Sequence, residues 1–160
     1  MNALRTAILT FLLHAFLAGP AAADSAVPAI MNLLKSGRLP KARIGVVVDF
    51  VCKQGNAEDL GYVYAQALKP DAFSHETRVA ALESLARATV SRKVKPQAEF
   101  SRLAELIRND SPKQQRSLQL AAIHLCGLWK VKAAATRLQQ LALNERADLE
   151  LRRAAIDSLM

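Results

Sequence analysis

Aromatic side chains are scarce in this sequence, since Phe, Tyr and Trp together make up 5% of its 160 residues. Proteins that bind single-stranded nucleic acid stack bases on aromatic rings, and this chain has few rings for that purpose. The formal net charge of +8 would by itself suggest nucleic acid as a partner. The lack of aromatics and the export signal described below both argue against it, and we expect no nucleic acid partner.

Cysteine is also rare, with Cys52 and Cys126 the only two. Two cysteines in an exported chain suggest a disulfide. We expect these two on helices that are separated by a third. Packed helices lie about 8–10 Å apart, so two such steps exceed the roughly 7 Å Cα separation that a disulfide allows. Both residues have apolar neighbours, and the sequence therefore predicts two free, buried thiols.

The sequence lacks a recognisable catalytic or metal-binding constellation. Ser74, His75 and Glu76 are adjacent, and adjacent residues on a helix point in different directions, so they do not form a catalytic triad. No His, Cys and Asp residues have the spacing of metal ligands. Three aspartates in turns before helices are interpreted as helix caps: Asp71, Asp110 and Asp148. We therefore expect no enzyme activity, no metal and no cofactor.

The first 23 residues have the pattern of a secretory signal peptide. Arg5 supplies the charged start, residues 6–18 form an apolar core, and Ala21–Ala23 form a small-residue cleavage site before Asp24. This run is too short to cross about 30 Å of hydrocarbon, which takes roughly 20 residues, and no second apolar run is long enough. The sequence predicts a periplasmic or secreted protein with no transmembrane segment in its mature chain, residues 24–160. The alternative is a signal retained as an anchor.

A short motif is repeated along the rest of the chain. RVAALESL at 78–85 returns as RRAAIDSL at 152–159, and a weaker copy, LAAI, lies at 120–123. The copies are 41 and then 33 residues apart, which is in the range of helical-hairpin repeats. The sequence therefore predicts an all-α fold, a right-handed α-solenoid of about four helical hairpins over residues 24–160.

Apolar spacing and terminal residues place the helices. Asn56, Ser74 and Ser111 are predicted N-caps, and Pro28 and Pro112 are expected where helices begin. The expected helices are 29–35, 42–54, 57–69, 75–90, 96–108, 112–128, 131–143 and 148–160.

Two further expectations concern the packing of these helices. We expect His124 to be packed in the core and Trp129 to fill the gap between repeat units. Because a repeat array should end in an atypical capping unit, we also expect the natural chain to continue beyond Met160.

The second-helix pattern R-x-A-A-hydrophobic-x-x-L resembles that of HEAT-type repeats over nearly all of residues 24–160. Residues 49–89 and 120–131 are similar to the HEAT-repeat region of large exported planctomycete-type proteins, described as membrane-bound dehydrogenase or haem-binding proteins. In that family the repeats are a spacer and interaction region, commonly beside a sugar-dehydrogenase-like propeller and a c-type cytochrome domain. The family's haem attaches through Cys-x-x-Cys-His, which is absent here. The resemblance therefore implies no haem ligand and no catalytic residue in this chain.

Basic residues are predicted to form a row along one edge of the solenoid. KVK occurs at 93–95 and, 37 residues later, at 130–132, each time directly after the second helix of a hairpin. Such a row would attract an anionic partner. The alternative is that these turns are simply solvated, with cations favoured at helix C-termini by the helix dipole. The candidate binding residues are Lys53, Arg92, Lys93, Lys95, Lys130 and Lys132.

Two functions are consistent with these features. The first is a non-catalytic exported scaffold of HEAT type that binds a protein partner or a neighbouring domain, with an anionic surface or polymer as a further candidate ligand. The alternative is the N-terminal structural segment of a periplasmic haem-binding or membrane-bound dehydrogenase protein whose active domain lies beyond residue 160.

Overall fold

A computed structural model of the chain describes residues 20–108 and 113–160, and these form helices and turns without a β-strand. The predicted all-α class is confirmed. The apolar core of the expected signal peptide, Asp110, and the expected helix start at Ser111 and Pro112 lie outside the described residues.

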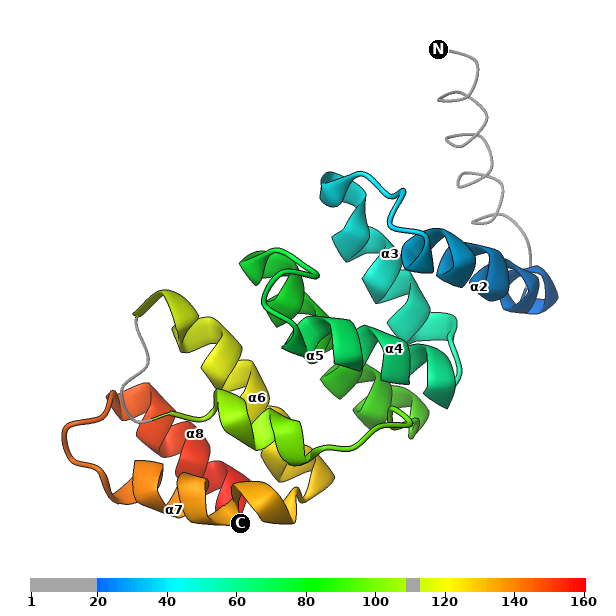
Figure 1. The fold of residues 1–160 in the computed structure, drawn as a ribbon. Coiled ribbons are helices and arrows are strands. Elements are labelled where there is room, and N and C mark those ends of the chain that lie inside the picture. Colours follow the sequence, from blue (N-terminus) through cyan, green and yellow to red (C-terminus); the bar gives the residue numbers. More distant parts are fainter. Residues whose placement is uncertain (1–19, 109–112) are drawn as a thin grey trace.

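Seven α-helices and three short 3₁₀ helices follow one another in the described residues (Figure 1). Their bounds are α2 Pro20–Lys35, α3 Lys41–Gln54, α4 Ala57–Leu68, α5 His75–Arg92, η1 Ser101–Leu106, η2 Lys113–Gln115, α6 Arg116–Trp129, η3 Lys132–Ala134, α7 Ala135–Leu143 and α8 Leu149–Leu159.

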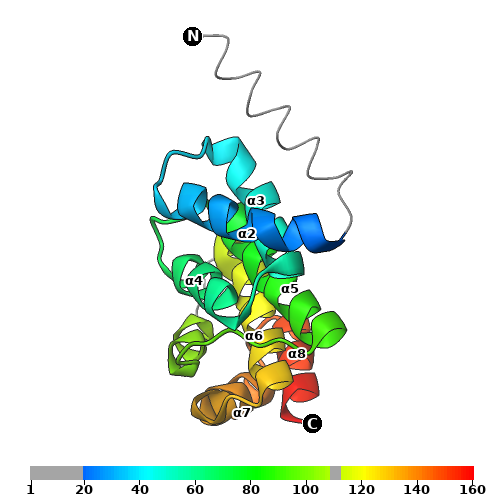
Figure 2. The ribbon, with the colours of Figure 1, turned by 90° about the vertical axis from the view of Figure 1, so that its right-hand side faces the viewer.

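Four of these helices form a row through the molecule. α3 packs on α5, α5 on α6, and α6 on α8. Figures 1 and 2 show α4, the segment that contains η1, and α7 on one side of this row. Each of these flanking segments precedes one helix of the row in the sequence, and α4 packs on α5 as α7 packs on α8. The core lies between the row and the flanking segments, and it includes Leu60, Leu82, Leu103, Ile123 and Leu141, each fully buried.

An equivalent hydrogen bond occurs at three places along the chain. Arg78 Nε, near the start of α5, donates to the Ala67 carbonyl oxygen at the end of α4 (2.7 Å). In α8, Arg152 Nε donates to the Ala142 carbonyl oxygen of α7 (3.4 Å). In α6, Gln119 Nε2 donates to the Arg108 carbonyl oxygen. The three donors are 41 and 33 residues apart, so the repeated motif corresponds to a repeated contact that satisfies carbonyl groups at the end of the preceding segment.

The predicted helix start at Pro28 is wrong, because α2 runs from Pro20 and contains Pro28 in its interior. A proline removes one backbone donor from a helix, and here the alanine-rich sequence and the burial of Val27, Met31 and Leu34 on one face offset that loss. α2 also continues across residues 23 and 24, where the sequence analysis places the end of the signal peptide.

The predicted helix at 96–108 is also wrong, because only Ser101–Leu106 forms a helix there, of the 3₁₀ type. Contacts with neighbouring segments replace its first turns. The Gln97 backbone N–H donates to the Ala57 carbonyl oxygen (2.7 Å), and the Tyr64 hydroxyl donates to the Glu99 carbonyl oxygen (3.3 Å). A Cβ at Gly61 would lie 2.5 Å from the Gln97 carbonyl oxygen, so α4 accepts this segment only because residue 61 is glycine.

Candidate functional site

A groove runs along the row of helices on the described surface. It has a volume of about 810 Å³ and lies between α3 and α5, with one residue from α6. A smaller hollow of about 280 Å³ between α5 and α6 adjoins it and shares Glu83, Ala86 and His124. The larger groove is lined by Asp49, Cys52, Lys53, Gln54, Glu83, Ser84, Ala86, Arg87, Ala88, Val90, Ser91, Arg92 and His124.

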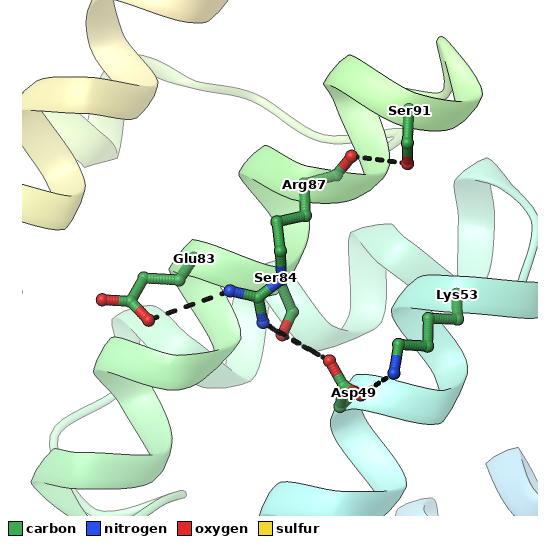
Figure 3. Close-up of polar contacts among 6 residues, drawn as sticks. All are labelled: Asp49, Lys53, Glu83, Ser84, Arg87 and Ser91. Carbon is green, nitrogen blue, oxygen red and sulfur yellow. Dashed lines mark hydrogen bonds and ion pairs between the residues drawn. The ribbon is translucent and has the colours of Figure 1, made fainter.

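A network of charged and polar side chains joins α3 to α5 in this groove (Figure 3). The Asp49 carboxylate accepts from Lys53 Nζ (2.7 Å), one turn further along α3. Across the helix interface it accepts from the Ser84 hydroxyl (3.0 Å) and from Arg87 Nη2 (3.4 Å). Arg87 also lies 4.0 Å from Glu83, one turn earlier on α5, in an i,i+4 ion pair.

Two opposing effects act on the pKa of Asp49. Partial burial raises the pKa of this carboxyl, but hydrogen bonds from Lys53, Ser84 and Arg87 stabilise the charged form and together lower the pKa below its usual value. Asp49 is therefore an anion at neutral pH, and it holds Lys53 and Arg87 in fixed positions at the groove.

The six candidate basic residues fall into two groups. Lys53 and Arg92 line the groove, and both have partners. Lys53 pairs with Asp49. Arg92 donates from Nη1 to the Cys52 carbonyl oxygen (2.8 Å) and from Nη2 to the Gly55 carbonyl oxygen (2.7 Å). Arg92 thus caps the C-terminus of α3 from the end of α5, as expected for a cation at the negative end of a helix dipole.

The remaining four candidates belong to the turns that end α5 and α6. Lys93 and Lys130 are the C-cap residues, both in the left-handed backbone conformation (φ 59° and 52°). After α6, the Val131 N–H donates to the Cys126 carbonyl oxygen (3.0 Å) and the Lys130 N–H to that of Gly127 (3.2 Å), which is a Schellman motif. All four lysines are exposed: Lys93, Lys95, Lys130 and Lys132.

The valine of each KVK motif has a structural role. Val94 and Val131 are half-buried against the core directly after the left-handed lysine. A hydrophobic contact at this position commonly accompanies such a helix end. The 37-residue spacing of the two motifs therefore reflects helix termination, while anion binding by the lysines stays a prediction.

Trp129 joins the ends of α5 and α6, as the sequence predicts. Its side chain is 5% exposed, and its Nε1 donates to Thr89 Oγ1 (3.0 Å). Its ring packs on Phe100 and Tyr64, with centroid separations of 4.6 and 5.7 Å. The Thr89 hydroxyl lies 3.0 Å from the Leu85 carbonyl oxygen and 3.3 Å from that of Val94, so Trp129 and the first KVK turn meet at this side chain.

The prediction for His124 is wrong, whereas His75 makes no contact with Ser74 that would suggest a catalytic triad. His124, expected in the core, is exposed and lines both hollows. Ala122 and Cys126, two residues before and after it, are buried, so His124 lies on a different side of α6 that faces the groove. His75 Nε2 lies 3.1 Å from the Ser117 hydroxyl of α6, so its hydroxyl partner is not the adjacent Ser74. The Ser74 hydroxyl instead accepts from the Thr77 N–H (3.2 Å) as the N-cap of α5.

The prediction of two free, buried thiols is confirmed. Burial raises the pKa of Cys52 and of Cys126 to about 12, so both are protonated at neutral pH and neither is a nucleophile.

Among the described residues, no group of three His, Cys, Asp or Glu side chains could hold a metal ion. Asp148 caps α8, where its carboxylate accepts from the Glu150 N–H (2.9 Å), in agreement with the capping role expected of it. The capping role expected of Asp71 is wrong, because Ser74 is the N-cap of α5 and Asp71 is exposed in the turn before it. Asp110 lies outside the described residues. No helix in the described part of the chain has the length and apolar character needed to span a membrane.

No protein-family model, no curated protein and no solved structure matches this chain. Its function is therefore inferred from the groove and from the arrangement of the helices.

Sequence reasoning misses most of the groove. Asp49, Ser84, Val90 and Ser91 are not among the predicted site residues, although Asp49 carries a usable signal. It is the only charged residue in the apolar run Ile44–Cys52, and a carboxylate on a packed helix needs polar partners from a neighbouring element.

Proposed function

We propose that this chain is a non-catalytic, exported scaffold of HEAT type that binds a protein partner along the groove of α3, α5 and α6. The recurring side-chain-to-carbonyl bond at Arg78, Gln119 and Arg152, together with the packing order of the helices, supports a right-handed α-solenoid. Solenoids of this kind present an extended surface formed by successive units, and the groove has that form.

The observation that carries the proposal is the composition of the groove. Three cations, Lys53, Arg87 and Arg92, line it together with two acids, Asp49 and Glu83. Val90 adds an apolar side chain that is 55% exposed. A groove with an excess of positive charge beside exposed apolar surface fits a protein segment that combines acidic and apolar side chains. The exposed lysines after α5 and α6 extend this positive charge to the edge of the molecule.

Export is part of the proposal and rests on residues 1–23. In the native host we expect the protein in the envelope fraction, with residues 1–23 removed from its N-terminus.

The groove is tested by site-specific photo-crosslinking in the native host. A photoreactive amino acid at position 90 should give a discrete cross-linked protein, whereas the same amino acid at Gln139, exposed on α7, should not. Combining the probe at position 90 with Lys53→Glu should reduce the cross-link several-fold, because it removes a cation from the groove.

Circular dichroism would establish that the Lys53→Glu variant is folded. Equal adducts from positions 90 and 139, or no adduct from either, would contradict binding in the groove.

A further inference from the structure

Two lysines have a backbone conformation that lysine seldom adopts. Lys93 and Lys130 have φ values of 59° and 52°, and they are the only non-glycine residues with a positive φ in the described part of the chain. In this conformation the Cβ of an L-residue comes close to the following carbonyl oxygen, and glycine avoids that contact because it has no Cβ. Helices that end in this way usually have glycine at this position. Helix termination alone therefore favours glycine at both positions.

The helix dipole does not account for these lysines either. A cation near a helix C-terminus is favourable, but any exposed position of the last turn would provide one without a left-handed backbone. α5 already has Arg92 in its last turn. Lysine nevertheless occupies the left-handed position after α5 and again after α6. We therefore looked for a role of the two side chains outside the fold.

The two lysines lie at the same edge of the molecule because α5 and α6 run parallel to each other (Figure 1). Near the start of each helix, His75 Nε2 lies 3.1 Å from the Ser117 hydroxyl. Near the end of each helix, Trp129 Nε1 donates to Thr89 Oγ1 (3.0 Å). Both helices thus end side by side. The turns that follow them carry four exposed lysines, which we call the lysine edge: Lys93, Lys95, Lys130 and Lys132.

The cations of the lysine edge have no anionic partner among the described residues. The ion pairs there involve Lys53, Arg87 and Arg116 instead. Glu99 is the nearest carboxylate in the sequence, and it accepts from the Ser101 N–H (3.1 Å). The lysine edge therefore presents positive charge that the described part of the chain does not neutralise.

The surroundings of the lysine edge indicate what kind of partner it fits. None of its four lysines lines either of the two hollows. The apolar residues beside them are turned inward, since Val94 and Val131 are half-buried and Trp129 is 5% exposed. A protein interface needs an apolar centre that is removed from water, and this edge offers none. A membrane that contains anionic lipids attracts exposed lysines without such a centre.

We propose that the lysine edge binds the surface of a membrane that contains anionic phospholipids, with the lysine Nζ groups next to the headgroup phosphates. The attraction is the sum of the single charges, and each lysine raises the affinity by about fivefold. This surface is separate from the groove, so its binding does not depend on the protein partner proposed there.

The test is sedimentation of the full chain with lipid vesicles of two compositions. One is phosphatidylcholine alone, and the other is phosphatidylcholine and phosphatidylglycerol in equal parts. The wild-type protein should bind the anionic vesicles more tightly, and the difference should disappear as the ionic strength rises to about 1 M. The neutral vesicles measure any contribution of the apolar residues 6–18, which is independent of lipid charge.

Replacing both left-handed lysines by glycine separates binding from folding. Lys93→Gly combined with Lys130→Gly should weaken binding to the anionic vesicles by roughly 25-fold, because two charges are lost. The melting temperature of this variant should equal or exceed that of the wild type, because glycine fits the left-handed conformation better. Weaker binding therefore cannot result from unfolding.

The matched control removes two cations far from the lysine edge. Arg92 contacts the end of α3 and Gln97 the start of α4, so the other ends of both helices lie away from this edge. Lys41 is the first residue of α3, Lys69 follows α4, and both are exposed. Lys41→Gln combined with Lys69→Gln should bind the anionic vesicles within about twofold of the wild type.

Four results would overturn the proposal. The first is equal binding of the wild type to the two kinds of vesicle at low ionic strength. The second is an equal loss of binding in the glycine variant and in the control, which would indicate an effect of net charge alone. The third is a glycine variant that is less stable than the wild type, since the lysines would then serve the fold. The fourth is binding to a soluble anionic polysaccharide such as dextran sulfate without binding to anionic vesicles.

Discussion

Asp49 shows how one residue links two helices and shapes the groove. It lies on α3 among apolar neighbours, and its partners Ser84 and Arg87 come from α5. Ser84 is buried, so its hydroxyl depends on this carboxylate and on Arg87 Nη2 (2.6 Å) for hydrogen bonds. Removing the carboxylate would therefore weaken the α3–α5 contact as well as release Lys53 and Arg87.

The lowered pKa of Asp49 predicts a pH-dependent contribution to stability. The charged form is favoured in the folded state, so the contribution is complete above the ordinary carboxyl pKa of about 3.9 and is lost as the pH falls through the lower folded value. Asp49→Asn should therefore be less stable than wild type at neutral pH, and the difference should shrink in acid.

Urea unfolding at neutral pH and below about pH 3 measures this difference in the free energy of unfolding. Asp71→Asn, in an exposed turn, serves as the control. A difference between wild type and Asp49→Asn that is the same at both pH values would exclude the proposed role of the charge.

At the scale of helices, glycine sets the distance between α6 and α8. A Cβ at Gly127 would lie 2.8 Å from both Cα and Cβ of Ser158, and these distances are shorter than any that real Cβ atoms adopt. The close approach lets the Ser158 hydroxyl donate to the Ile123 carbonyl oxygen (3.0 Å). A Cβ at Gly45, inside α3, would meet no neighbouring element within 4 Å, so Gly45 sets no such distance.

The two glycines predict opposite effects of the same substitution. Gly127→Ala should destabilise the protein by about 1–3 kcal/mol, because α8 must move away from α6. Gly45→Ala should stabilise it by up to about 1 kcal/mol, because alanine has the higher helix propensity.

Thermal and chemical unfolding of both variants measures these changes. If both variants lose stability, or if neither does, the close approach of α6 and α8 at Gly127 does not determine the effect of the substitution.

At the scale of the whole molecule, the helices of the row differ in how far they are covered. α5 lies between α3 and α6 and has seven buried residues, whereas α8 packs on α6 and α7 and has two, Leu151 and Ala155. A helix is stabilised by the helices that pack on it, so a helix with one open side opens more readily.

Hydrogen exchange should therefore be slowest in α5 and faster in α8 when the protein is dilute. Exchange in α8 that is as slow as in α5 in dilute protein would contradict the expected difference.

Features that depend on neighbouring residues in the chain could be predicted from the sequence alone. The spacing of apolar residues is a local signal, and it placed α3, α4, α5, α7 and α8 within a few residues of their observed bounds. N-caps are local too, so Asn56, Ser74 and Asp148 were identified correctly as helix starts. The repeated motif places Arg78 and Arg152 at equivalent positions, but that both donate to a carbonyl oxygen of the preceding helix is seen only in the structure.

How these helices combine depends instead on contacts between distant parts of the chain. The segment at 96–108 has helical periodicity, yet contacts of Gln97 and Glu99 with α4 hold most of it outside a helix. His124 is exposed because α5 and α6 leave a hollow beside it. The groove exists because Ser84 meets Asp49 across 35 residues of sequence, and Arg92 meets the Cys52 carbonyl oxygen across 40. Such contacts arise from the packing of helices in three dimensions, which local spacing does not encode.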